Sequence, residues 1–191
     1  VATDFAMFRQ AVGAYWGAHD PVPMTLVFIG DARSVNQYIA ATRASSVVVH
    51  LGAGQPYSGD LRITLAVAYL QRWIGRMLWI GSTKEGSEAH SFWFTEGVTR
   101  HLARELLFQM GYLNPTEYLD EINGLLSVTA TSPHRALSNT ELIRRASAKG
   151  IMPLIVARGA LYASSVNNRI RTREPSSDLN HVIRSLLKQA V

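Results

Sequence analysis

The chain of 191 residues contains no cysteine, which excludes disulfide bonds and thiolate metal sites without deciding the compartment. It also lacks any apolar run approaching the roughly 18–20 residues of a membrane span. Charged residues make up only 17% of the chain and hydrophobic residues 47%, a composition typical of folded domains rather than disordered segments. These features predict a single domain with a sizeable core and no membrane-spanning helix.

Histidine is sparse and is never paired at helical spacing. Two side chains share one face of a helix, and can bind one zinc ion, when they lie three or four residues apart. The closest two of the six histidines are eleven residues apart. The six are His19, His50, His90, His101, His134 and His181. The sequence therefore contains no H-x-x-x-H zinc motif.

The chain has neither an initiator methionine nor a signal-peptide pattern, and it begins at Val1. We interpret it as a mature form or as a fragment of a longer chain. The net charge of +5 comes mostly from the second half, and we interpret it as a solvated basic surface. No aromatic residues alternate with the arginine run Arg169, Arg171 and Arg173, as they do in proteins that bind single-stranded nucleic acid. We therefore expect no nucleic-acid partner.

The first 58 residues mix helix and strand signals and form a predicted α+β lobe, residues 1–58. Apolar residues at helical spacing predict a first helix, with Asp4 as its cap. Two β-branched or apolar runs predict strands, with a short helix between them and a glycine-rich loop after them. The predicted elements are helix 4–18, strand 23–30, helix 34–44, strand 45–51 and loop 52–59.

From Asp60 onward the patterns are helical, which predicts a helical lobe over residues 59–191. The stretch 60–80 is apolar around most of its circumference, so we expect a helix capped by Asp60, ended by Gly81 and buried at the centre. A helix over 91–110, bearing one apolar stripe, is expected to pack against it. Further helices are expected to begin at Asn114-Pro115, at Ser138 with Glu141, at Pro153 and at Ser177-Asp178.

Five short phrases in the helical part occur in the order found in one peptidase family. They are Trp93-Phe94-Thr95-Glu96-Gly97-Val98-Thr99, Glu117-Tyr118-Leu119, Ser138 to Glu141, Arg158-Gly159-Ala160-Leu161 and Ser177-Asp178-Leu179. In these phrases the chain resembles the gluzincin metallopeptidase domain of the glycyl aminopeptidase family, whose members often carry a PDZ domain. The resemblance implies an α+β, thermolysin-like fold and one metallopeptidase-like domain over residues 1–191.

The resemblance also implies a zinc site that has lost its chemistry. The family binds zinc through two histidines four apart on the first helix, beside a glutamate base, and through a third ligand in the Glu-Gly phrase. Tyrosines that precede its Lys-Gly phrase stabilise the oxyanion. Aligned on Trp73, Val67 and Gln71 take the places of the two histidines and Ala68 that of the base. Glu96 is the remaining ligand position in the Glu-Gly phrase, and Ile155 and Val156, shortly before Arg158-Gly159, stand where the tyrosines would be. The resemblance thus implies no catalytic residue, no metal and no cofactor.

Three functions stay open at this point. The first is a catalytically inactive, metallopeptidase-like domain that binds a peptide or protein partner. The second is an active zinc hydrolase with a relocated metal site built from Glu96, His90 and His101. The third is a structural or assembly module. By analogy with exported relatives, a periplasmic or exported location is favoured, and the sequence leaves the oligomeric state open.

The sequence also predicts the environments of one glutamate, two histidines and three tryptophans. Glu96 is expected to face Val67 and Gln71 and to accept a hydrogen bond from Gln71 or from an arginine. Alternatively, it is an acid of the first helical turn that pairs with Arg100. His90 and His101 are expected at the surface or against loops. The tryptophans Trp73, Trp79 and Trp93 are expected in the core.

Overall fold

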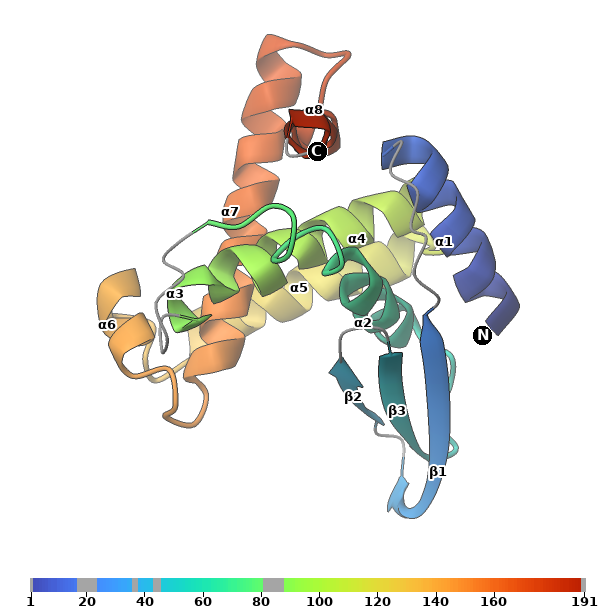
Figure 1. Ribbon diagram of the computed structural model, residues 1–191. Coiled ribbons are helices and arrows are strands. Elements are labelled where there is room, and N and C mark those ends of the chain that lie inside the picture. The colour runs from blue at the N-terminus through green and yellow to red at the C-terminus, as the bar shows by residue number, and fades with distance from the viewer. Residues whose placement is uncertain (1, 17–23, 36–37, 43–45, 81–87, 190–191) are drawn as a thin grey trace.

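The computed structural model describes residues 2–16, 24–35, 38–42, 46–80 and 88–189, and it has a small sheet and a larger helical part (Figure 1). The first part consists of α1 (Ala2–Trp16), β1 (Thr25–Val35), β2 (Tyr38–Thr42) and β3 (Ser46–Ala53). The second part consists of α2 (Gly59–Leu70), α3 (Glu88–Phe92), the π-helical segment η1 (Trp93–Val98), α4 (Thr99–Gln109), α5 (Pro115–Thr131), α6 (Asn139–Arg144), α7 (Ile151–Arg173) and α8 (Leu179–Gln189). An α+β class with a mainly helical second part is therefore confirmed.

The sheet has the strand order β1-β3-β2, with β1 parallel and β2 antiparallel to the central strand β3. Val47 and Val49 of β3 are buried in the main core. The strands predicted over 23–30 and 45–51 are confirmed, but the helix predicted over 34–44 is wrong. β1 continues to Val35 and the following described residues form β2, because pairing with β3 overrides a weak helical pattern. Residues 23, 36–37 and 43–45 lie outside the described part of the chain.

The first helix is confirmed and covers α2 with aromatic side chains. Phe5 and Phe8 lie edge-on to Tyr69, with ring centroids 5.8 and 6.1 Å away, and Trp16 lies edge-on to Trp73 at 5.5 Å. The helix begins at Ala2, so the residue predicted as its cap, Asp4, lies in the first turn instead. Residues 17–18 of the predicted helix lie outside the described residues.

The central helix α2 is buried as predicted, but it begins slightly earlier than predicted and ends well before the predicted end. Its cap is Ser58, whose hydroxyl accepts from the Leu61 N–H at 3.3 Å, rather than Asp60. The helix ends at Leu70, ten residues before the predicted end, and the chain continues in turns. Gly75 has φ +100°, a left-handed conformation that interrupts a helix, and its N–H donates to the Leu78 carbonyl at 2.7 Å. The predicted stop at Gly81 lies outside the described residues.

The predicted helix over 91–110 is present, but it begins at Glu88 and contains the π-helical segment η1. Capping boxes at Asn114 with Glu117 and at Ser138 with Glu141 begin α5 and α6 as predicted. The helix predicted from Pro153 begins two residues earlier, at Ile151, as α7. Figure 1 shows α4 and α5 crossing α2, and α7 standing against η1 with α8 near its far end.

The last helix, α8, follows Asp178 as predicted, but its buried face is narrower than the sequence pattern indicates. Leu179, Ile183 and Leu187 are buried, whereas Val182 and Leu186 are exposed. None of the helices in the described part of the chain combines the length and apolarity needed to cross a membrane.

Candidate functional site

Two glycines hold η1 directly against α7. A Cβ on Gly97 would lie 2.7 Å from the Val156 carbonyl oxygen, and a Cβ on Gly159 would lie 2.1 Å from the Trp93 carbonyl oxygen. Neither position has room for a side chain, so the two backbones meet only because both residues are glycine. The Glu-Gly and Arg-Gly phrases of the sequence therefore form one helix contact, which fixes the position of the neighbouring Glu96.

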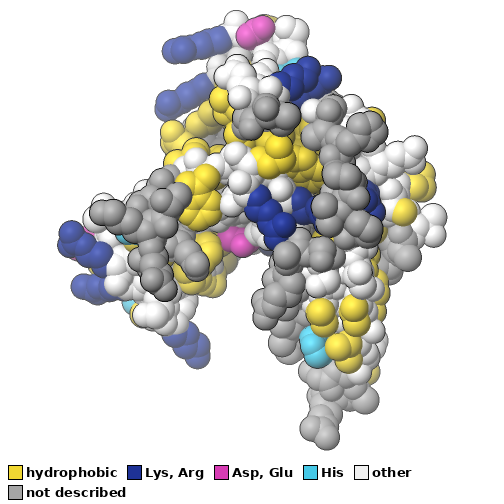
Figure 2. Space-filling model, viewed as in Figure 1, with side chains coloured by type: hydrophobic (Ala, Val, Ile, Leu, Met, Phe, Trp, Pro, Cys, Tyr) yellow, Lys and Arg dark blue, Asp and Glu magenta, His cyan; other side chains and the backbone are white. Residues whose placement is uncertain are grey.

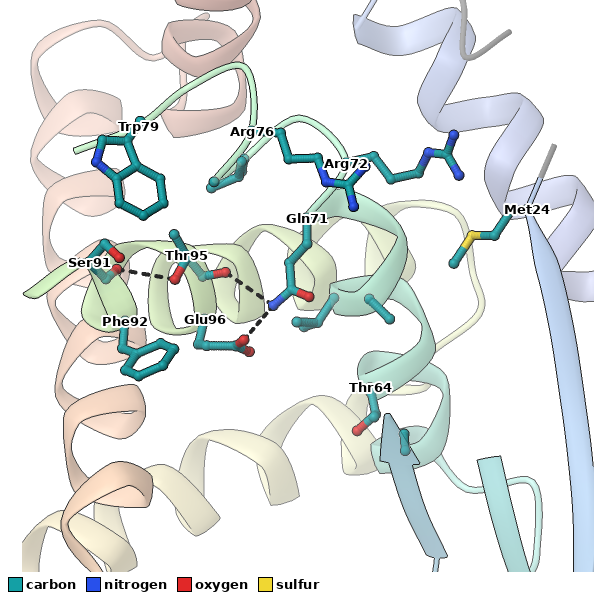
Figure 3. Close-up of a pocket in the computed structure, with 15 residues that line it drawn as sticks. Met24, Thr64, Gln71, Arg72, Arg76, Trp79, Ser91, Phe92, Thr95 and Glu96 are labelled. Carbon is teal, nitrogen blue, oxygen red and sulfur yellow. Dashed lines mark hydrogen bonds between the residues drawn. The ribbon is translucent and has the colours of Figure 1, made fainter. Parts of the chain in front are cut away.

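Glu96 and Gln71 form the polar centre of the site. Gln71 is the first residue after α2, and its side-chain amide donates to the Glu96 carboxylate at 2.6 Å and to the Thr95 carbonyl at 3.4 Å (Figure 3). Thr95 in turn donates its hydroxyl to the Ser91 carbonyl at 3.2 Å. The predicted contact between Glu96 and Gln71 is therefore present, and it joins the end of α2 to the π-helical segment.

The carboxyl group of Glu96 is held in a partly dehydrated environment. Burial raises the pKa of Glu96, while the hydrogen bond from Gln71 and the positive charge of Arg100 oppose that rise. Arg100 forms hydrogen bonds with Glu121, at 2.5 and 2.9 Å, and with Asp60 at 2.7 Å. The alternative interpretation of Glu96, as the partner of Arg100, is thus not what the hydrogen bonds show.

Glu96 and Gln71 border a hollow of about 590 Å³ between α2, β2 and η1. Val67 and Ala68, both buried residues of α2, line the same hollow, so this space brings together four of the six cleft positions named from the sequence. Trp79 also lines it and is 38% exposed, so the expectation that Trp79 lies in the core is wrong. The reason is the early end of α2: in the turns that follow it Trp73 and Ile74 stay in the core, whereas Trp79 does not.

A second hollow, of about 780 Å³, shares Glu96 with the first. Val156 of α7 lines it, whereas Ile155 packs in a separate core cluster with Leu142 and Leu154. The helical rotation of about 100° between neighbouring residues separates the two positions. Of the residues at the family's oxyanion position, only Val156 therefore borders the space around Glu96.

The second hollow is acidic on one side and apolar on the other, which sequence reasoning missed. Its apolar wall comes from α5 and α7 and contains Leu125, Val128, Met152, Pro153, Val156 and Ala157. Its polar wall contains Asp60, Glu96, Glu117, Asp120 and Glu121 with Arg100. Hydrogen bonds to Glu121 and the charges of Glu121 and Asp60 raise the pKa of Arg100 despite its burial, so this arginine stays charged.

A second buried polar group lies one turn further along the same helical run, in α4. Arg104 donates to His101 Nδ1 at 2.8 Å and to Ser164 Oγ at 2.9 Å, and Tyr118 donates to the Glu105 carboxylate at 2.6 Å. We call these five residues the α4 cluster. Because arginine can only donate, Nδ1 accepts and the neutral ring carries its proton on Nε2.

The α4 cluster corrects one expectation. His101 is 1% exposed, not at the surface or against a loop, because Ser164 of α7 covers it. Burial and the positive charge of Arg104 lower the pKa of His101 to about 3. The helical spacing of 101, 104 and 105 placed these groups close together, but their burial depends on α7, which no local pattern reveals.

A catalytic zinc ion of the family does not fit the residues at the site. Such an ion needs three protein ligands, and the side chains here are one carboxylate, one amide and an aliphatic group from Val67. No group of three His, Cys, Asp or Glu side chains that could hold a metal occurs among the described residues. His90, His101 and Glu96 therefore do not assemble into the relocated site that the sequence left open.

Comparison with known proteins gives a likeness in fold. The sequence matches no protein-family model and no curated protein sequence. Among solved structures, the chain is similar to the crystal structure of an aminopeptidase N family protein from Idiomarina loihiensis, with a TM-score of 0.77 and 19% sequence identity. The match covers 98% of this chain and 36% of that chain, so this chain spans about a third of that protein's length. At this identity the likeness shows a coarse aminopeptidase-like fold.

Proposed function

We propose that this chain is a metallopeptidase-like domain without catalytic zinc, thermolysin-like over residues 1–191, and that it binds an extended peptide or protein segment in the hollow beside Glu96. The observation that carries the proposal is the hydrogen bond from Gln71 to Glu96. At the positions that the resemblance assigns to zinc ligands, the amide of Gln71 donates a hydrogen bond to the one remaining carboxylate, that of Glu96. An aminopeptidase-like fold thereby keeps its hollow without the metal chemistry.

The free edge of β2 supports an extended ligand. Among the described residues, the strand order β1-β3-β2 leaves one side of β2 without a partner strand, and Ala40 of β2 lines the hollow beside Glu96. Backbone groups along such an edge bind an added strand, and pockets next to it receive alternate side chains. Tyr38 secures this edge to α2, because its hydroxyl hydrogen-bonds Asp60 and, at 2.8 Å, Thr64.

Calorimetric titration tests the proposal. The ligand is a hexapeptide of alternating valine and threonine, acetylated and amidated at its ends. We expect saturable binding that is lost when every second peptide nitrogen is methylated, because methylation removes the strand hydrogen bonds. Ala40→Trp and Thr64→Trp fill the hollow from β2 and from α2, and each should weaken binding by about tenfold or more. Ala14→Trp, on the exposed side of α1, is the matched control and should bind normally.

Two results would contradict the proposal. One is equal binding by all three variants, with far-UV circular dichroism showing that each is folded, which favours a structural or assembly module. The other is stoichiometric zinc in protein purified without chelator together with peptide hydrolysis, which favours an active hydrolase.

The assignment of Val67, Ala68 and Gln71 to the lost ligand and base positions has its own test. Val67→His with Ala68→Glu and Gln71→His should confer zinc affinity, with Glu96 as the third ligand. Hydrolysis should stay negligible, because Val156 offers no oxyanion donor and such a donor is worth about 10²–10³ in rate. A folded triple variant that binds no zinc would mean that the alignment on Trp73 is wrong.

A further inference from the structure

A third hollow, of about 280 Å³, lies at the corner where α6 meets α7 and η1. It shares no lining residue with the two hollows that meet at Glu96. Its walls include the aromatic residues Trp93 and Tyr162, the aliphatic residues Ile143 and Ile155, and the polar residues Asn139 and Arg158. Pockets for whole drug-sized ligands have about 300–1,000 Å³, so this space suits a single bulky side chain.

The aromatic walls are open to a partner. The rings of Trp93 and Tyr162 meet edge-on with centroids 6.1 Å apart, and Tyr162 is 59% exposed. An exposed tyrosine beside a half-buried tryptophan offers a large apolar contact area at low conformational cost, which is typical of positions that dominate the energy of protein interfaces.

The positive charge of Arg158 is not neutralised by a carboxylate. Its guanidinium donates to the Leu137 carbonyl at 2.9 Å, to Asn139 Oδ1 at 2.8 Å and to the Arg135 carbonyl at 2.7 Å. All three acceptors are uncharged, and no described carboxylate forms a salt bridge with this arginine. The hydrogen bonds fix the guanidinium in place beside the hollow without pairing it to an anion.

The surroundings of the third hollow are basic. Residues 132–173 contain eight Lys and Arg and one Asp or Glu, a net charge of +7 in a chain whose total is +5. Arg144, Arg145 and Lys149 are exposed on α6 and after it, whereas the one acid, Glu141, accepts hydrogen bonds from Ser138 in the helix cap. Figure 2 shows Lys and Arg side chains projecting from the end of the molecule that α6 occupies in Figure 1.

We propose that this corner is a docking site for an acidic segment of a partner protein, which inserts one aromatic side chain between Trp93 and Tyr162 and places its carboxylates against Arg144, Arg145 and Arg158. The charge steers the segment to the corner, and the aromatic anchor provides the contact energy. A nucleic acid fits less well, because the hollow accepts one side chain and no row of stacking residues continues from it.

The test is a titration of the whole chain with acetyl-Asp-Glu-Phe-Asp-Glu-amide, followed by calorimetry. We expect saturable binding that weakens at least about fivefold when alanine replaces the peptide's phenylalanine, and that is absent for the Lys-Lys-Phe-Lys-Lys peptide. Tyr162→Ala and the pair Arg144→Glu with Arg145→Glu should each weaken binding about fivefold or more, because one removes a wall of the anchor hollow and the other reverses the charge.

The matched control is the pair Arg171→Glu with Arg173→Glu. It makes the same charge change on exposed residues of α7, about 20 Å along the helix from Arg158, and should change binding less than about twofold. Ala40→Trp, which fills the hollow beside Glu96, should leave binding of the acidic peptide unchanged. The experiment therefore tests the docking site independently of the proposed peptide-binding hollow.

Three outcomes would overturn the docking site. The first is no binding up to about 1 mM peptide. The second is equal weakening by the two arginine pairs, which means non-specific charge attraction. The third is an oligonucleotide that binds through Arg144 and Arg145 but is insensitive to Tyr162→Ala, which makes the corner a nucleic-acid surface.

Discussion

Two buried polar centres lie on one continuous helical run, and they differ in access. In η1, Glu96 meets Gln71 at the wall of two hollows. In α4, Arg104 and His101 are enclosed by Ser164 of α7. Glu96 and Gln71 are partly buried and line hollows that a ligand can enter, whereas His101 and Arg104 are almost fully buried and cannot contact a ligand. The comparison indicates that Glu96 belongs to a site, whereas the α4 cluster serves to join α4, α5 and α7.

The backbone geometry also differs between the two centres. The open centre, Glu96 with Gln71, has its carboxylate in a π-helical segment, a geometry common at functional sites. The closed centre, the α4 cluster, is built around a regular α-helix. The π-helical segment is held by glycine contacts with α7, and the α4 cluster by side-chain hydrogen bonds with the same helix. α7 thus supports one centre through its backbone and the other through Ser164.

Removal of Arg104 should have the largest effect. Arg104→Ala leaves Glu105 without its adjacent cation and opens space beside His101 and Ser164, so the free energy of unfolding should fall by about 3–5 kcal/mol. Urea denaturation at pH 7 measures the loss. The double variant Arg104→Met with Glu105→Gln removes the charges together and should lose much less, and an equal loss in both variants would contradict a charge-based cause.

Gly159→Ala should come next and should affect the open centre. The added Cβ would lie 2.1 Å from the Trp93 carbonyl oxygen, so α7 and η1 must separate, with a loss of about 2–3 kcal/mol in unfolding free energy. The same change at Gly124, where no atom lies within 4 Å, should be neutral or stabilising by up to about 1 kcal/mol. Similar losses at the two glycines would refute the close helix contact.

Acid should destabilise the closed centre by a moderate amount. The pKa of His101 is about 3 in the fold and about 6.5 when unfolded, so the unfolded chain binds more protons between these values. The stabilising contribution of the neutral His101 ring is fully present above pH 6.5 and is lost as the pH falls towards 3. From pH 7.5 to 5.5 the loss should be about 1.4 kcal/mol.

The matched variant for the acid effect is His101→Asn, which keeps an acceptor for Arg104. Because the two proteins differ only at position 101, the difference between their pH dependences isolates His101. Parallel pH dependences of the two proteins would contradict the lowered pKa.

Glu96→Gln should have the smallest effect and the opposite sign. The pKa of Glu96 is raised in the fold, so its favourable contribution is present below the unfolded pKa of about 4.3 and is lost as the pH rises through the folded value. At pH 7 the buried carboxylate is therefore a cost, and Glu96→Gln should stabilise the protein by up to about 1 kcal/mol. Urea denaturation at pH 7 and pH 5 should show this gain shrinking in acid, and a destabilised variant would mean that Glu96 depends on its charge for a structural role.

The starts of α5 and α6 were predictable because their causes are local. Asn114 and Ser138 each accept from a backbone N–H three residues on, and Glu117 and Glu141 return the hydrogen bond, so a few letters of sequence define each start. The end of α2 was not predictable in this way. Residues after Leu70 are apolar enough to continue a helix, and the left-handed Gly75 and the packing of Trp73 against Trp16 end it instead.

The candidate site was predicted only as far as the sequence resemblance reached. Aligning on Trp73 named Gln71, the Glu-Gly phrase named Glu96, and the contact between them is present. The separation of Ile155 from Val156, the burial of His101 and the acidic wall beside Arg100 were missed. Each of these depends on which helix faces which, and therefore on contacts between residues far apart in the chain.

The sequence by itself determined the chemistry available to this protein: no cysteine, no paired histidines, the Glu96-Gly97 phrase and a basic stretch over 132–173. It also determined the capping-box starts of α5 and α6, because those depend on neighbours a few residues away. Only the tertiary structure decided that β2 forms an edge strand, that Glu96 meets an amide beside two hollows, and that His101 is enclosed. These outcomes depend on close packing between distant segments, since Gly97 and Gly159 set the helix contact that fixes which side chains remain accessible.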